Sequence, residues 1–171
     1  MRPLKGDYPE YAQKYIDLIE GDDIISILHN TSKEMSDVIN SFPQSKGDYA
    51  YAENKWTVKQ VIGHLTDTDR IFAYRALAIA RGEKQPLPSF DQDLYVQNGM
   101  FNEKNLAEIT YEYRLTRESN LLLFRSFDKS VYQNRGIAAG YEVTLLGIMF
   151  MVAGHQKHHI KILKEKYLEQ H

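Results

Sequence analysis

The chain of 171 residues contains no cysteine. This absence excludes disulfide scaffolds, cysteine-ligated zinc and iron–sulfur sites, and a thiol nucleophile carried by the protein itself. Any thiol chemistry at this protein would therefore use a thiol that a substrate brings. Proline and tryptophan are also scarce, with five and one residues.

An excess of charge of one sign is missing as well. The 21 Lys and Arg residues are balanced by 23 Asp and Glu residues, which gives a formal charge of −2. No basic segment offers an electrostatic footprint for a phosphate backbone, so we expect no nucleic-acid partner.

Long hydrophobic runs are absent too. The longest, residues 143–154, is well short of the roughly 20 residues that a membrane span needs, and the first residues lack the apolar core of a signal peptide. We therefore expect no membrane association and a cytoplasmic location.

The composition, 43% hydrophobic and 26% charged, is typical of a globular protein. A chain of this length buries roughly 70% of its unfolded surface, so its core needs no stapling metal. We therefore expect residues 1–171 to form one domain, in which any metal would serve function rather than folding.

Apolar residues recur at helical spacing over four long segments, about residues 22–42, 57–80, 102–127 and 143–167. Asp22 or Asp23 is a candidate N-cap for the first of them and Thr57 for the second. Shorter helical patterns cover residues 11–19 and 91–98, the latter closed by Gly99. No segment shows convincing strand alternation, and residues 128–142 are expected to be a connection. The sequence predicts an all-α fold, a four-helix bundle with short additional helices.

Histidines provide the clearest chemical signal in the sequence. There are six of them: His29, His64, His155, His158, His159 and His171. At 100° per residue, His155 and His159 continue the inward apolar stripe of the last helix, whereas His158 points about 60° away from His155. Two imidazoles at positions i and i+4 can converge on one ion. Buried histidines with hydrogen-bond partners are the alternative interpretation, and both remain open from this spacing alone.

His64 is the candidate for a third ligand. It lies at the flank of the apolar stripe of the second long helix, on the same face as Thr68 and Arg75. Three neutral histidines leave coordination positions for water or substrate, as catalytic metal sites do. An all-nitrogen set suits Zn²⁺, Ni²⁺ or Fe²⁺.

Several rival motifs are excluded. A zincin protease would carry His-Glu-x-x-His, but Gln156 stands where the glutamate general base would be, and glutamine cannot accept the proton. The sequence also lacks a Gly-x-Ser-x-Gly elbow, a glycine-rich phosphate loop and the Glu-x-x-His pairs of di-iron bundles. One metal ion is therefore expected, rather than two.

Four segments of the sequence form a recognisable combination: Lys55-Trp56-Thr57-Val58-Lys59-Gln60-Val61-Ile62-Gly63-His64-Leu65, residues 72–82, Pro88-Ser89-Phe90-Asp91-Gln92-Asp93, and Gly154-His155-Gln156-Lys157-His158-His159. Together they resemble the DinB-like (YfiT-like) superfamily of four-helix bundles, over about residues 20–167. The resemblance implies a bundle that binds one divalent metal ion, zinc or nickel, through His64, His155 and His159. It also implies a homodimer.

The superfamily includes thiol-dependent transferases and isomerases, which use bacillithiol or mycothiol, alongside metal-dependent hydrolases. We take as the leading hypothesis that the metal lowers the pKa of a small-molecule thiol, whose thiolate then attacks an electrophilic substrate in an S-transferase reaction of the bacillithiol type. The alternatives are a hydrolase that uses metal-bound water, and a non-catalytic metal-binding or interaction bundle.

Four further residues are weaker candidates around such a site. Asp67 and Asp91 could orient a ligand or act as a base, although solvated or capping carboxylates are the plainer interpretation. Arg75 shares the face of His64 and could receive a substrate carboxylate, or form a surface salt bridge instead. Tyr95 could line the pocket mouth, although twelve tyrosines make that assignment a weak one.

Overall fold

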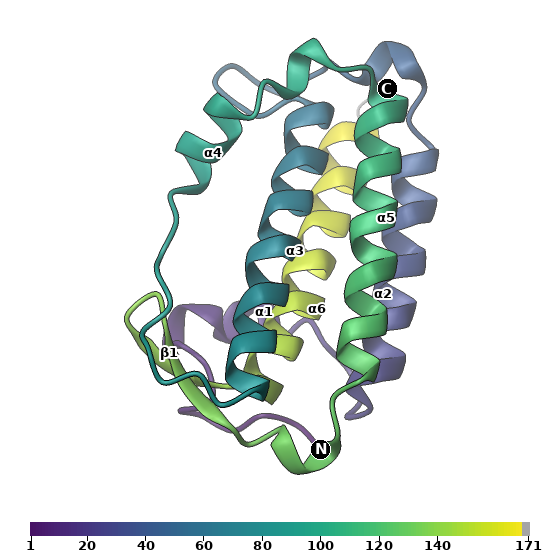
Figure 1. Cartoon of the computed structure of the whole chain (residues 1–171). Coiled ribbons are helices and arrows are strands. Elements are labelled where there is room, and N and C mark those ends of the chain that lie inside the picture. The colour runs from purple at the N-terminus through teal and green to yellow at the C-terminus, as the bar shows by residue number, and fades with distance from the viewer. Residues whose placement is uncertain (169–171) are drawn as a thin grey trace.

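The computed structural model describes residues 1–168, and four long helices form its body (Figure 1). These helices are α2 (Ile24–Asn40), α3 (Val58–Ala80), α5 (Leu106–Arg125) and α6 (Leu145–Ile162). The predicted all-α four-helix bundle is thereby confirmed.

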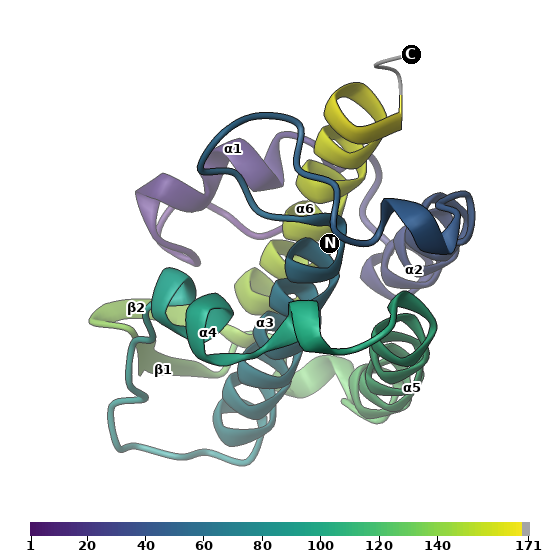
Figure 2. The ribbon, with the colours of Figure 1, turned by 90° about the horizontal axis from the view of Figure 1, so that it is seen from above.

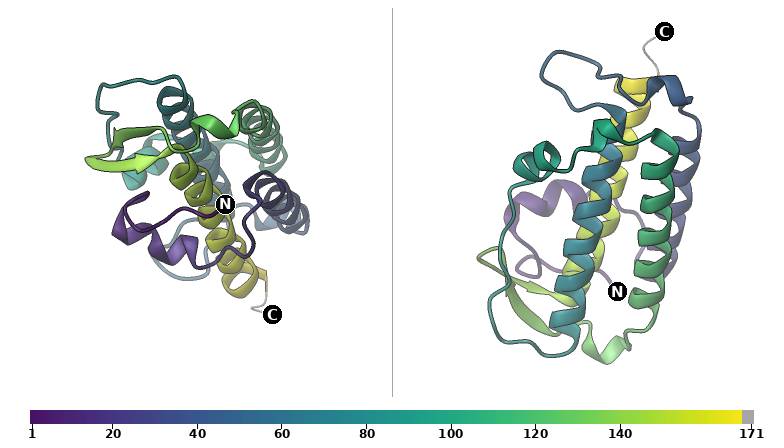
Figure 3. Two further views of the ribbon diagram at one scale, coloured as in Figure 1. Left: turned by 90° about the horizontal axis from the view of Figure 1, so that it is seen from below. Right: turned by 45° about the horizontal axis from the view of Figure 1, so that its top comes forward.

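The connectivity of the bundle is not a simple up-and-down series. Helices α3 and α5 pack side by side and run in the same direction, whereas α2 and α6 run in the opposite one (Figure 1). The crossover between α3 and α5 must therefore travel back along the bundle, and it carries the short helix α4 (Gln92–Asn98) on the way (Figure 3, right).

Side-chain caps fix where the long helices begin. Thr57 forms a capping box at the start of α3, where its hydroxyl accepts from the Gln60 amide at 3.2 Å, and Asp23 caps α2. Helix α5 begins after its cap Asn105, and α6 begins after Thr144. The predicted starts at residues 102 and 143 were therefore slightly too early.

Shorter elements complete the described chain. α1 (Gln13–Ile16) follows a 3₁₀ turn at Glu10–Ala12, so the pattern over residues 11–19 forms only two short turns. Further 3₁₀ turns and one π-helical segment lie at Gln44–Lys46, Phe101–Glu103, Lys129–Val131 and Leu163–Leu168.

The connection before α6 contains a β-hairpin that the sequence did not predict. Strands β1 (Arg135–Ala138) and β2 (Tyr141–Thr144) pair antiparallel, and the turn between them places Ala139 and Gly140 at positive φ. Leu87 of the crossover bonds to this hairpin, with its amide 2.8 Å from the carbonyl oxygen of Ile137. The expectation of no strand in residues 128–142 was thus wrong for this short segment.

The short elements gather on one side of the bundle. Viewed along its axis, α1, α4 and the hairpin lie on the side of α3 and α6, away from α2 and α5 (Figures 2 and 3). These short elements thus cover α3 and α6 on that side (Figure 2).

A polar layer separates two apolar clusters in the core. One cluster contains Leu28, Phe124 and Phe150, and the other contains Met35 and Leu65. This layer contains the buried polar side chains Asp69, Arg117, Asn120, Gln156, His64, His155 and His159, together with the hydroxyl of Tyr113, whose ring belongs to the second cluster. Buried polar groups are costly without hydrogen-bond or metal partners, so this layer is the part of the core with the capacity for chemistry. Among the helices of residues 1–168, none combines the length and apolarity needed to cross a membrane.

Candidate metal centre

The rings of His64, His155 and His159 converge on one point between α3 and α6. Nε2 of His155 lies 3.2 Å from Nε2 of His64 and 3.1 Å from Nε2 of His159. One ligand nitrogen from each ring can be chosen so that all lie within 4.8 Å of one another. The structure thus brings together the three histidines that were predicted as ligands from the sequence. His64 and His155 lie 91 positions apart in the chain.

Hydrogen bonds among these rings cannot account for the arrangement. An imidazole nitrogen carries either one proton or one lone pair, so Nε2 of His155 cannot bond to both neighbours at once. A shared cation satisfies all three nitrogens. With metal–nitrogen distances of about 2.1 Å, tetrahedral geometry separates the nitrogens by roughly 3.4 Å and octahedral geometry by roughly 3.0 Å. The two spacings to Nε2 of His155 fall between these values, and all three donor nitrogens lie within 4.8 Å of one another, so the donor set fits one divalent metal ion.

Burial keeps the three rings in the neutral form that metal binding needs. Their exposed fractions are 3%, 9% and 8% for His64, His155 and His159. Burial lowers the pKa of His64 to about 4. It also lowers the pKa of His155 and His159 well below the ordinary value, and the neighbouring imidazoles add to that shift.

Two neighbouring side chains, Thr68 and Trp56, contact the ring of His64. The Thr68 hydroxyl oxygen lies 3.4 Å from Nδ1 of His64, one helical turn further along α3. When Nδ1 carries the proton and donates it to this oxygen, Nε2 keeps its lone pair toward the other two rings. The Trp56 ring also packs against His64, with ring centroids 4.8 Å apart.

Helix α1 supports the second half of the cluster. The Tyr15 ring packs edge-on against His155, with centroids 5.8 Å apart, and against His158 at 5.4 Å. Gly154 makes this contact possible, because a Cβ atom there would lie 2.3 Å from the Tyr15 carbonyl oxygen. His158 faces Tyr15 and stays outside the cluster of three; His29 is exposed on α2, and His171 lies outside the described residues.

A cavity of about 170 Å³ opens directly beside His64 and His155. It is bounded by α1, α3, the crossover, the hairpin turn and α6. Its walls are formed by Tyr11, Tyr15, His64, Thr68, Phe72, Arg75, Ser89, Phe90, Gln92, Ala139, Met151 and His155. None of these residues is aspartate or glutamate, so the cavity offers aromatic walls, one cation and no carboxylate.

The other candidates of the sequence analysis lie in different surroundings. Arg75 is in the cavity wall, whereas Asp67 pairs with Arg70 at 3.5 Å on the outer face of α3. Asp91 caps α4 by accepting from the amides of residues 93 and 94. Tyr95 lines an adjoining cavity of about 240 Å³, where its ring lies 5.3 Å from that of Phe90.

Gln156 points away from the histidine cluster. Its side chain is fully buried and donates to the Tyr113 hydroxyl at 2.7 Å, within the polar layer of the core. The position that would hold a zincin's general base therefore serves the packing of the bundle.

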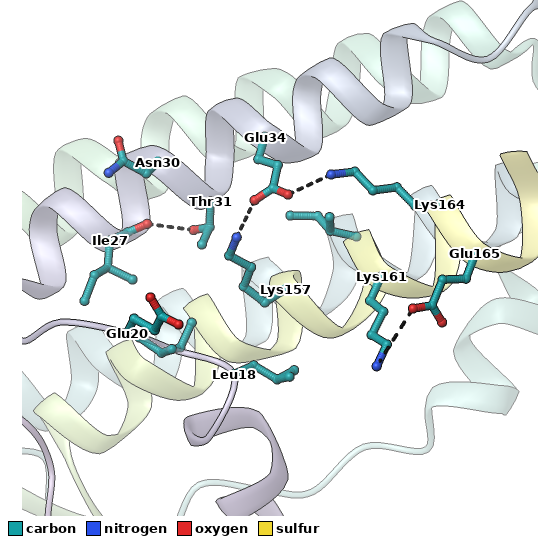
Figure 4. Close-up of a pocket in the computed structure, with 12 residues that line it drawn as sticks. Leu18, Glu20, Ile27, Asn30, Thr31, Glu34, Lys157, Lys161, Lys164 and Glu165 are labelled. Carbon is teal, nitrogen blue, oxygen red and sulfur yellow. Dashed lines mark hydrogen bonds and ion pairs between the residues drawn. The ribbon is translucent and has the colours of Figure 1, made fainter. Parts of the chain in front are cut away.

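A larger cavity of about 600 Å³ lies between α2 and α6 and contains no histidine (Figure 4). Apart from Glu20, its charged side chains pair with one another: Glu34 binds both Lys157 and Lys164, and Lys161 reaches Glu165 at 3.8 Å (Figure 4). Because all three lysines of this cavity already have acidic partners and it contains no candidate metal ligand set among the described residues, the smaller cavity beside the histidines is the better candidate for chemistry.

Sequence reasoning missed the contribution of the N-terminal segment. Tyr11 and Tyr15 reach the cavity only through the packing of α1 on α6. The one local signal was Gly154 within a long helix, since a glycine there commonly marks a close approach of another backbone.

Comparisons with known proteins agree with this architecture. The family model of the DinB superfamily matches residues 27–163. A protein of Oceanobacillus iheyensis, OB0413, which bears the provisional name of a metal-dependent hydrolase, is 25% identical over 145 residues, 78% of this chain and 77% of its own length.

Two solved structures share the fold. YfiT from Bacillus subtilis, provisionally described as a metal-dependent hydrolase with an unusual four-helix bundle topology, superposes with a TM-score of 0.74 at 17% identity, over 96% of this chain and 90% of YfiT. A mycothiol-dependent maleylpyruvate isomerase superposes with a TM-score of 0.72 at 10% identity, over 86% of this chain and 62% of the isomerase. The match of the family model over most of the length confirms the resemblance seen in the sequence, and the chain belongs to the DinB superfamily.

Proposed function

We propose that this protein is a metal-dependent enzyme that transfers a group to the sulfur of a small-molecule thiol. The observation that carries this proposal is the cavity beside the three histidines, whose walls contain no carboxylate in the described chain. A divalent ion held by His64, His155 and His159 supplies Lewis acidity, which lowers the pKa of a thiol or water that reaches it.

The lack of a carboxylate favours a thiol over water as the nucleophile. Hydrolysis benefits from a positioned base that takes a proton from water during attack. A thiol has a pKa near 8.5 in the free state, so a modest lowering makes it a thiolate at neutral pH without such a base. Neither Asp67, which pairs with Arg70, nor Asp91, which caps α4, is among the residues that line the cavity. This lining therefore suits attack by a thiolate better than hydrolysis.

The reaction balances without a redox step. The thiol releases its proton to solvent, its sulfur forms a bond to the electrophilic carbon, and the leaving group departs with the electron pair of the broken bond. The aromatic walls of Tyr15 and Phe72 restrict water near the reacting atoms. The chain has no cysteine of its own to compete for the electrophile.

Hydrolysis is the second candidate, and the names of OB0413 and YfiT favour it. The two activities separate in one experiment on the purified protein. Metal per chain is measured first, and then the consumption of monochlorobimane is followed with several small thiols, alongside a panel of esters. Turnover that needs both metal and thiol supports the transferase, and turnover that needs metal alone supports the hydrolase. Bound metal without any turnover would contradict both and leave a metal-binding module.

A further inference from the structure

Arg75 is a buried cation that no acid of the described chain neutralises. Its exposed fraction is 6%, and its one protein acceptor among residues 1–168 is the Pro88 carbonyl oxygen, 2.7 Å from Nη2. Nearby arginines differ: Arg70 bonds to Glu112 at 2.8 Å, and Arg117 lies 3.2 Å from Asp69. Because a guanidinium has five N–H donors, most of those on Arg75 remain available for a ligand.

Arg75 borders the cavity of the histidines as well as the adjoining cavity that Tyr95 lines. Arg75, His64 and His155 line the same space. The Phe72 ring lies near both the cation and the cluster, with its centre 6.4 Å from that of the His155 ring and 5.7 Å from the Arg75 guanidinium carbon. The cation and the histidine cluster therefore share one aromatic wall of the same cavity.

The surroundings of Arg75 favour a carboxylate as its ligand. A buried charge without a partner is costly, and an anionic ligand removes that cost. The guanidinium fork matches the two oxygens of a carboxylate, and apolar walls such as Phe72 and Phe90 strengthen the interaction by excluding water. A phosphate dianion commonly receives several cations or a nest of amides, whereas this cavity contains one cation.

We propose that Arg75 is the anion-recognition residue of this cavity, which binds a small substrate by its carboxylate and places the substrate's reactive atom at the histidine cluster. This inference rests on the proposed function in that it takes the cavity as the substrate site. It goes further by assigning the substrate class, which is small carboxylic acids that fit the cavity of about 170 Å³.

The test compares two probes that differ in charge and share one chain length, hexanoate and hexanamide. Their affinities are measured by titration calorimetry with the full chain, both zinc-loaded and metal-depleted. A charge-assisted hydrogen bond to a buried guanidinium predicts that hexanoate binds about 10- to 100-fold more tightly than hexanamide. Arg75→Gln is expected to abolish this preference, whereas Arg114→Gln, the same change at an exposed position of α5, is expected to keep it.

Several results would overturn the assignment. These are equal affinity of the wild type for both probes, an undiminished preference in Arg75→Gln, or displacement of hexanoate by inorganic phosphate at a lower concentration than by a second carboxylate. If Arg75→Gln does not fold, the wild type still gives the answer through modification by phenylglyoxal followed by mass spectrometry. Hexanoate, and not hexanamide, should then protect Arg75.

The design also separates this assignment from the proposed function. A protein that prefers hexanoate through Arg75 but shows no thiol-dependent turnover contradicts the transferase proposal and retains the carboxylate site. A protein with thiol-dependent turnover and no carboxylate preference contradicts the carboxylate site and retains the transferase proposal. Metal content of Arg75→Gln, measured in the same preparation, should equal that of the wild type because Arg75 is not among the ligand histidines.

Discussion

Gly154 lies so close to Tyr15 that a Cβ atom on the glycine would be 2.3 Å from the tyrosine's carbonyl oxygen. The contact joins α1 to α6 one residue before His155, whose ring then packs against that of Tyr15. A residue without a side chain thus determines how tightly the N-terminal segment closes over the candidate metal centre.

Gly154→Ala is therefore expected to destabilise the protein, although alanine is the better helix former. In an unpacked helix this change would add up to about 1 kcal/mol of stability. Here the extra methyl group must displace backbone, and overpacking of this kind costs roughly 1–3 kcal/mol. The free energy of unfolding in urea measures the balance. An increase in stability would show that α1 does not dock on α6 as described.

Removal of any one ligand histidine should empty the metal centre. His64→Ala, His155→Ala and His159→Ala each leave two nitrogens, and we expect a loss of metal affinity greater than the roughly 10- to 100-fold cost of losing an outer hydrogen-bond partner. Metal per chain after dialysis against a weak chelator provides the measurement. His158→Ala is the matched control, since His158 neighbours His159 but faces Tyr15. Equal metal loss in the control would contradict the assignment of ligands.

Thr68 offers a finer test of the same centre. Thr68→Val keeps the shape of the side chain and removes the oxygen that lies 3.4 Å from Nδ1 of His64, so metal affinity should fall about 10- to 100-fold. Thr66→Val is the control, because Thr66 is equally buried on the same helix and its hydroxyl donates to the Ile62 carbonyl oxygen instead. Competition with a fluorescent zinc chelator measures both. Equal affinities for the two variants would exclude an orienting role for Thr68.

The parts of this site that follow helical periodicity were predictable from the sequence. Thr57 caps α3 through a local pattern, and the i, i+4 spacing places His155 and His159 on one face whatever lies around them. His64 required a further assumption, that its helix packs against the helix of His155. The amphipathic stripes of both helices made that assumption reasonable.

The parts that depend on distant contacts were not predictable. The hairpin turns at Ala139-Gly140, which lacks the Asn-Gly or Asp-Gly signal of such turns, and its strands have only four residues each. Arg117 is 1% exposed, yet arginine in an amphipathic helix ordinarily indicates the solvent face. Only the placement of Asp69 on another helix explains its burial.

The metal-free protein should lose stability as the pH falls from about 6.5. A histidine whose pKa is lower in the folded chain than in the unfolded chain binds its proton more weakly when folded, so unfolding takes up protons between the two values. For His64 that window extends from about 6.5 down to about 4. Each such histidine contributes a slope of up to about 1.4 kcal/mol per pH unit, with full stability above the window.

Urea unfolding of the metal-free protein at several pH values across this window measures the slope. His64→Ala should make it shallower, because the variant has one fewer proton to take up on unfolding. His29→Ala, at an exposed position of α2, should keep the slope of the wild type. A stability that stays constant from pH 6.5 to 5 would contradict the burial of the three rings.

The buried pair of Asp69 and Arg117 should matter far more to stability than the exposed pair of Arg70 and Glu112. Asp69 lies 3.2 Å from Arg117, and both side chains are almost fully buried. Removal of one partner leaves an uncompensated buried charge, so Arg117→Met should cost roughly 3–5 kcal/mol. Arg70→Met removes a pair of similar length, 2.8 Å, at a half-exposed position, and should cost less than about 1 kcal/mol.

The double variant Asp69→Asn/Arg117→Met separates the interaction between the two charges from the packing cost of each single substitution. Because it leaves neither charge unpaired, it should be more stable than the sum of the two single changes implies. Urea unfolding of the four proteins in this cycle gives the coupling free energy directly. Additive effects would mean that the two charges do not interact in the folded chain. The polar layer would then be held by the neutral contacts of Asn120 and Gln156 rather than by an ion pair.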